Sequence, residues 1–114
     1  MILVVSDDPQ VREEATFAFP ADVEISVVED AKDAWTSLQQ FKPDAIILSL
    51  RSGNAGGYSL LAQMSQHPSL KGIPSLLLLE RDQDRWLGRQ SGATTCLTKP
   101  VEAGDLAAAT LALI

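Results

Sequence analysis

Residues 1–9, MILVVSDDP, decide the fold of this chain. The run Ile2–Ser6 is almost continuously apolar, which is typical of a strand buried on both faces of a parallel sheet. Asp8-Pro9 follows directly, an N-capping residue and then the proline that helices favour at their first position. A buried strand that leads straight into a helix begins a βα unit, so this stretch predicts an α/β fold.

The same alternation of short apolar runs and longer amphipathic stretches continues along the chain. The predicted strands are Ile2–Ser6, Val23–Val28, Ala45–Leu50, Ser75–Leu79 and Thr94–Thr98, and the predicted helices span residues 9–18, 31–40, 57–66, 82–91 and 102–113. Apolar and polar residues alternate in the second run, which indicates a half-exposed edge strand. No linker or repeat divides the sequence, so we predict a single domain, 1–114, with a parallel sheet covered by helices on both faces.

Charge and composition exclude several classes of function. The 114 residues include 9 Lys and Arg against 15 Asp and Glu, a net charge of −6, which disfavours nucleic acid or an anionic membrane as the direct partner. One cysteine and one histidine form neither an internal disulfide nor a structural zinc site. The sequence shows no signal peptide and no apolar stretch of about 20 residues, so we expect a cytoplasmic location.

Polar side chains lie in or just after the carboxyl ends of four predicted strands, where open α/β sheets bind ligands. They are Asp7 and Asp8, Ser49, Glu80, and Lys99. Two adjacent carboxylates and a lysine at one crevice favour a site for a hard cation and an oxyanion.

The chain resembles the receiver (CheY-like) domain of two-component response regulators. The resemblance is carried by residues 2–9, residues 42–48, Gly57, and residues 92–100, which end in LTKP. It implies a flavodoxin-like sandwich of five βα units with strand order 2-1-3-4-5. In that family the acidic pair and an aspartate ending the third strand bind Mg²⁺, and the aspartate accepts a phosphoryl group from a histidine kinase. The lysine pairs with the phosphoryl group, and a Ser/Thr and an aromatic residue switch conformation.

This sequence departs from the family pattern at the positions that carry the chemistry. The acceptor aligns with Ser49, the hydroxyl switch with Leu79, the aromatic switch with Cys96, and a loop proline with Gly53. A serine hydroxyl is neutral at pH 7 and is a poor nucleophile without a base. We therefore predict a degenerate pseudo-receiver that is not phosphorylated at Ser49.

The retained residues also have simpler structural interpretations. Losing the acceptor carboxylate predicts weak or absent Mg²⁺ binding at Asp7 and Asp8. Asp8 caps the first helix in this interpretation, Asp7 pairs with Lys99, and Lys99 neutralises the acidic pair or bonds to Ser49. A Ser–Lys hydrolase would need an oxyanion hole that the sequence does not reveal, so we expect no enzyme activity.

A basic stripe offers a candidate partner surface. Arg81, Arg85 and Arg89 recur every four residues beside Trp86, on what is predicted to be one helix. Arginine and tryptophan are enriched in interface hot spots, and in the receiver family the face of the fourth helix, fifth strand and fifth helix binds partners or forms dimers. The alternative is a solvated face with local Asp–Arg pairs and with Trp86 packed on the core.

Two functional hypotheses follow. The preferred one is two-component signalling by protein–protein contact, through a protein partner or a homodimer, without phosphorylation. The alternative is a small-ligand or ion sensor that uses the crevice of Asp7, Asp8, Ser49 and Lys99.

Overall fold

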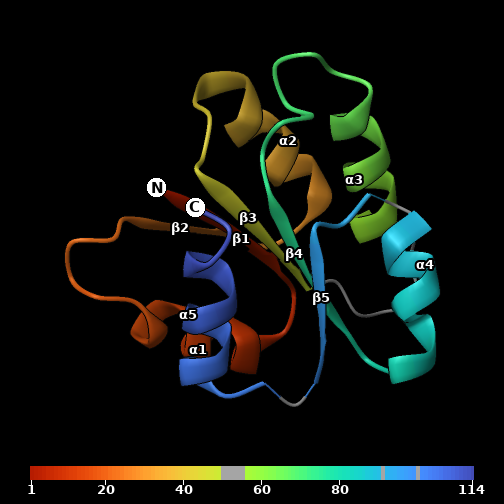
Figure 1. Ribbon diagram of the computed structural model, residues 1–114. Helices are drawn as coiled ribbons and strands as arrows, with labels where there is room; N and C mark the ends of the chain where they lie inside the picture. The colour runs from red at the N-terminus through yellow and green to blue at the C-terminus, as the bar shows by residue number, and fades with distance from the viewer. Residues whose placement is uncertain (50–55, 91, 100) are drawn as a thin grey trace.

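Five parallel strands form one sheet in the order β2-β1-β3-β4-β5 (Figure 1). The computed structural model describes residues 1–49, 56–90, 92–99 and 101–114. The strands are β1 (Ile2–Ser6), β2 (Ile25–Val28), β3 (Ala45–Ser49), β4 (Ser75–Leu79) and β5 (Thr95–Thr98). The helices are α1 (Pro9–Ala18), α2 (Ala31–Gln40), α3 (Gly56–Ser65), α4 (Arg85–Gln90) and α5 (Ala103–Leu111), with a 3₁₀ turn at Asp82–Asp84. The predicted α/β class and strand order are confirmed.

Helices cover both faces of the sheet, as the apolar strands require. Figure 1 shows α1 and α5 together on one face and α2, α3 and α4 on the other. Alternate residues of β1 divide between the two layers: Leu3 and Val5 belong to one core cluster with Leu38 of α2, and Ile2 and Val4 belong to the other. The three central strands are buried along their whole length, because each has a neighbour on both edges and helices above and below.

The two outer strands are less buried. All four residues of β2 are half-buried and β2 pairs only with β1, which confirms the predicted edge strand. β2 begins at Ile25 rather than at Val23, and β5 begins at Thr95 rather than at Thr94. Leu50 and Gly53, which entered the predictions for the third strand and its following loop, lie outside the described residues.

The fourth helix differs most from its prediction. The sequence predicts a helix over residues 82–91, but Asp82–Asp84 form a 3₁₀ turn and α4 begins at Arg85. Arg81 precedes that turn in an extended conformation, with φ −138° and ψ 142°. Beyond the end of α4, Gly92 has φ +98°, a left-handed conformation that glycine adopts without strain. The predicted end of the helix before Gly92 is confirmed.

Candidate functional site

Asp8 links the first strand to both the first helix and the lysine of the site. Its Oδ1 accepts a hydrogen bond of 3.0 Å from the Gln10 N–H, so it caps α1 as predicted. Its Oδ2 accepts a bond of 2.9 Å from Lys99 Nζ. Ser6 supports this turn, because its Oγ accepts from the Asp8 N–H at 3.0 Å. The local fold therefore aims one carboxylate at the crevice.

Lys99 is held by two carboxylates from two loops. Its Nζ lies 2.9 Å from Asp8 Oδ2 and 2.8 Å from Glu80 Oε1, and its side chain is only 13% exposed. Its backbone N–H also bonds to the Leu79 carbonyl at 2.8 Å. The prediction that Lys99 neutralises an acidic group is confirmed. Of the acidic pair, Asp8 is the residue whose carboxylate the α1 cap turns toward the lysine.

Glu80 lies at the end of a predicted strand, but the sequence indicates no partner and no function for it. It directly follows β4, at the same edge of the sheet as Asp8 and Lys99, and its side chain is about half exposed. That position at a strand's carboxyl end was the available signal, because such residues gather at one edge of a parallel sheet. The Asp8–Lys99–Glu80 triad joins the segments that follow β1, β5 and β4.

Ser49 lies at the end of β3 and aligns across the sheet with Ser6. The residue is fully buried, and its Oγ has no hydrogen-bond partner among the described parts of the chain. The predicted Lys99–Ser49 bond is not formed, since Lys99 Nζ bonds to Asp8 and Glu80. Among the described residues no base is hydrogen-bonded to this hydroxyl, and the Lys99 ammonium group is already paired with two carboxylates.

A cavity of about 280 Å³ borders the triad. Its lining includes the carboxylates of Asp8, Glu14 and Glu80 together with Lys99. Within the described residues, no cluster of three His, Cys, Asp or Glu side chains has the arrangement to hold a metal ion. One Asp8 oxygen is bound to Lys99, and the position that would supply a further carboxylate is Ser49. At position 49 the chain therefore lacks the carboxylate that the family resemblance places among the Mg²⁺ ligands.

The two switch positions are both buried within the sheet. Leu79 ends β4 at 3% exposure, and Cys96 lies in β5 at 9% exposure. Burial raises the pKa of the Cys96 thiol, while the positive charges of Arg85 and Arg89 act in the opposite direction. Gly88 of α4 lies directly above this thiol, since a Cβ added there would sit 2.7 Å from the sulfur. The two switch positions therefore carry neither a hydroxyl group nor an aromatic ring that could change conformation.

The basic stripe is only partly as predicted. Arg81 lies outside α4, so the three arginines do not share one helix. Arg81 is paired with Asp84 at 3.3 Å, and Arg85 Nε lies 2.9 Å from Asp82 Oδ1. The local Asp–Arg pairs of the alternative interpretation are therefore present.

A tertiary network rather than a helical repeat determines the start of α4. Arg85 Nη1 donates to the Cys96 carbonyl at 3.0 Å, and the Thr98 hydroxyl donates to Asp82 Oδ1 at 2.5 Å. The hydrogen bond from Thr98 to Asp82, and next the bond from Arg85 to Asp82, lower the pKa of Asp82. Cys96 and Thr98 both belong to β5, so β5 holds the turn in place.

Trp86 stands on the outer side of this network. Its side chain is 69% exposed, so the alternative in which it packs on the core is wrong. Leu111 and Ile114, at the end of α5 and beyond it, are also exposed. In Figure 1, β5 lies between α4 and α5 at one side of the molecule.

Comparison with known proteins decides the family. The model of the response regulator receiver domain matches residues 2–111. The chain belongs to this family. It is therefore a receiver-like signalling domain of the kind found in two-component systems.

Relatives of this receiver domain are similar along nearly its whole length. Response regulator Rre1 of Synechocystis is 29% identical over 111 residues, which cover 94% of the chain and 48% of that protein. An uncharacterised 14.6 kDa protein of Leptolyngbya boryana is 30% identical, with 92% and 82% covered. The receiver domain of a signal transduction histidine kinase from Syntrophus aciditrophicus has a TM-score of 0.86 at 27% identity, with 98% and 87% covered. The chain thus spans about half the length of Rre1.

No helix in the described part of the chain is both long enough and apolar enough to cross a membrane.

Proposed function

We propose that this receiver domain signals through protein–protein contacts and is not phosphorylated at Ser49. The observation that carries the proposal is the state of the acceptor position: a neutral, fully buried hydroxyl without a partner in the described residues. The lysine that would meet a phosphoryl group is engaged by Asp8 and Glu80. A phosphoryl donor would meet neither an ionised acceptor nor a free ammonium group.

Incubation with acetyl phosphate and Mg²⁺, followed by intact-mass measurement, tests this proposal. We expect no added phosphoryl mass on this chain, while a phosphorylatable receiver domain treated in parallel gains it. The variant Ser49→Asp restores the carboxylate at the acceptor position and measures how much phosphorylation that single change recovers. An acid-labile adduct on an aspartate, or a stable one on Ser49, would contradict the proposal.

The partner surface that we propose is the face formed by α4, β5 and α5. Trp86 is 69% exposed on this face and Arg89 is exposed as well, and both residue types are enriched in interface hot spots. The bonds from Arg85 to the Cys96 carbonyl and from Thr98 to Asp82 hold the start of α4 against β5. A partner or a second copy would meet a preformed surface, which reduces the ordering cost of binding.

Sedimentation velocity over a range of concentrations tests the second-copy form, and pull-down with a defined partner tests the other. Trp86→Ala combined with Arg89→Glu is expected to abolish association. Phe41→Ala is the matched control, because Phe41 is also an exposed aromatic but follows α2. Association that survives the double variant would remove this face from consideration.

A second candidate is an ion or small-ligand sensor at the crevice of Asp7, Asp8, Ser49 and Lys99. The 280 Å³ cavity that Asp8 and Lys99 line favours it, as does the Ser49 hydroxyl, which has no partner among the described residues. Titration with Mg²⁺ or a nucleotide, followed by NMR, separates the two candidates. Saturable shifts that cluster at Asp8 and Lys99 would favour the sensor, and their absence would favour the signalling role alone.

A further inference from the structure

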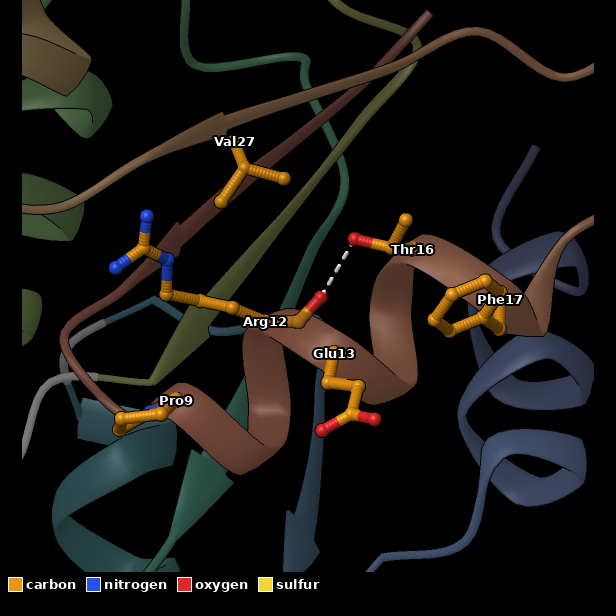
Figure 2. A pocket seen from close by; sticks show the side chains of 6 residues that line it. All are labelled: Pro9, Arg12, Glu13, Thr16, Phe17 and Val27. Carbon is orange, nitrogen blue, oxygen red and sulfur yellow. Dashed lines mark hydrogen bonds between the residues drawn. The ribbon is translucent and has the colours of Figure 1, made fainter.

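A groove of about 350 Å³ lies between α1 and β2, and neither the triad residues nor residues of α4 line it. Figure 2 shows Val27 pointing from β2 toward α1, with Arg12 and Thr16 reaching from α1 into the same space. Phe17 closes one end of the groove and is 77% exposed, more than any other large apolar side chain that the structure describes. The Thr16 hydroxyl donates to the Arg12 carbonyl at 2.7 Å, so its one donor hydrogen is used within the helix.

The groove borders an open edge of the sheet. β2 pairs with β1 alone, and Ile2 N–H donates to the Glu24 carbonyl at 2.8 Å. Peptide groups of successive residues in a strand point to opposite edges, so those of Ile25 and Val27 point away from β1. Unpaired peptide groups at an edge are a template for pairing with another chain. Val27 thus presents its peptide groups to the edge and its side chain to the groove.

Arg12 supplies a charge that the described residues do not balance. Its side chain is half-buried, and in the described parts of the chain its guanidinium has no carboxylate partner. Glu13 follows it on α1, but Figure 2 shows the Glu13 side chain directed away from β2. A partly desolvated arginine gains most from a carboxylate that accepts both of its N–H groups.

We propose that this groove binds an extended segment of a partner protein, which adds a strand to β2 and directs one apolar and one acidic side chain toward α1. The apolar side chain packs on Phe17 and Val27, and the acidic side chain pairs with Arg12. Strand residues two apart lie about 6.6–6.8 Å from each other on one face, close to the rise of about 7.5 Å along α1 that separates Arg12 from Phe17. An apolar-x-acidic sequence therefore matches the groove.

Charges at the two ends of β2 define the flanks of that segment. Glu24 precedes the strand and Glu29 follows it, and both are exposed. A strand added beside β2 passes both carboxylates, so basic residues outside the apolar-x-acidic core would complement them. Such binding combines main-chain hydrogen bonds for affinity with side-chain pockets for specificity.

The probe is the peptide acetyl-Lys-Thr-Val-Thr-Asp-Lys-amide, titrated into the ¹⁵N-labelled full chain and followed by NMR. We expect saturable shifts at Ile25–Val28 and along the Arg12 side of α1, with a dissociation constant on the order of 1 mM or tighter. Replacing the aspartate of the peptide with asparagine is expected to weaken binding about tenfold, because it removes the charge that meets Arg12.

Backbone methylation tests whether the peptide joins the sheet. One peptide carries N-methyl groups on Val and Asp, and a second carries them on the two Thr residues. Alternate N–H groups of a strand point to opposite edges, so only one of the two peptides loses the hydrogen bonds to β2. We expect one methylated peptide to bind like the parent and the other to lose binding.

Variants of the protein complete the test. Arg12→Gln is expected to weaken binding of the parent peptide about tenfold and to weaken binding of the asparagine peptide much less. Phe17→Ser removes the exposed ring and is expected to weaken binding of both peptides. Glu14→Gln, on the same helix but not among the residues that line the groove, is the matched control and leaves binding within about twofold.

Three outcomes would overturn the proposal. No shift at millimolar peptide, or equal binding by both methylated peptides, would show that β2 does not accept a strand. Shifts that depend on protein concentration without peptide and disappear with Arg12→Gln would make a second copy the occupant. The result is independent of the proposed signalling face, because Trp86 variants leave this groove intact.

Discussion

Ser6 and Ser49 stand side by side at the ends of β1 and β3, and both are fully buried, but their hydroxyls differ in bonding. Ser6 Oγ accepts from the Asp8 N–H at 3.0 Å, whereas Ser49 Oγ has no partner among the described residues. One serine helps to build the turn that positions Asp8. The other occupies the acceptor position as a small polar group without a compensating bond.

The two serines are therefore expected to respond oppositely to alanine. Ser49→Ala removes a buried hydroxyl without breaking a described bond, so the free energy of unfolding is expected to stay unchanged or rise by up to about 1 kcal/mol. Ser6→Ala leaves the Asp8 N–H without its partner and is expected to cost about 1–2 kcal/mol. Urea denaturation of both variants measures the difference, and a large loss on Ser49→Ala would reveal a bond that its hydroxyl makes.

The contact of Gly88 with Cys96 leads to a prediction for α4. A Cβ at position 88 would lie 2.7 Å from Cys96 Sγ and 3.2 Å from Leu77 Cδ2. Alanine is better than glycine in a helix by about 1 kcal/mol, but overpacking costs about 1–3 kcal/mol. Gly88→Ala is therefore expected to destabilise the protein.

A double-mutant cycle isolates that contact. Cys96→Ala removes the sulfur, so adding it to Gly88→Ala is expected to recover about 1 kcal/mol of the loss. Gly104→Ala in α5 is the matched control, since nothing lies within 4 Å of its added Cβ, and it is expected to stabilise the helix. Additive effects of the changes at 88 and 96 would show that α4 shifts easily over β5.

Much of the fold was predictable from local pattern, for reasons visible in β1 and β4. Each is a continuous apolar run bounded by polar residues, and each has the predicted limits, Ile2–Ser6 and Ser75–Leu79. Asp8-Pro9 likewise marked the start of α1 correctly, because capping depends on residues that are neighbours in sequence.

The start of α4 was not predictable in this way. Arg81, Arg85 and Arg89 have helical spacing, but the backbone at Asp82–Asp84 is held by bonds from Thr98 and to the Cys96 carbonyl. Those partners lie 16 and 11 residues away, so no local pattern records them. The same holds for Lys99, whose partner Glu80 is 19 residues distant. Long-range hydrogen bonds and ion pairs determine these parts of the structure, so the local sequence pattern did not predict them.

The Cys96 thiol makes stability fall at alkaline pH. Burial raises its pKa in the folded state, so the unfolded chain releases the thiol proton at a lower pH than the folded one. The contribution is fully present below the ordinary thiol pKa of about 8.5 and is lost as pH rises through the folded value. The Cys96→Ala variant has no titrating group at position 96, so it is expected to lose less stability than the original protein between neutral and alkaline pH. Equal pH profiles for the two proteins would contradict this assignment.

The two ion pairs of Lys99, with Asp8 and with Glu80, are expected to contribute unequally to the free energy of unfolding. The Asp8 and Lys99 side chains are 16% and 13% exposed, whereas Glu80 is 54% exposed. An exposed pair is screened by water and salt and contributes about 0–1 kcal/mol, so Glu80→Gln is expected to cost little and to cost less still at high salt.

Asp8 carries two roles that different substitutions separate. Asp8→Asn keeps a good N-cap but loses the charge that faces Lys99, so its cost measures the ion pair. Asp8→Ala loses both and is expected to cost about 1 kcal/mol more, which is the value of the cap. Thermal denaturation of Asp8→Ala, Asp8→Asn and Glu80→Gln should rank them in that order of damage. If Glu80→Gln proved the most damaging, Lys99 would depend chiefly on the β4 side, and the acidic pair after β1 would serve only to begin α1.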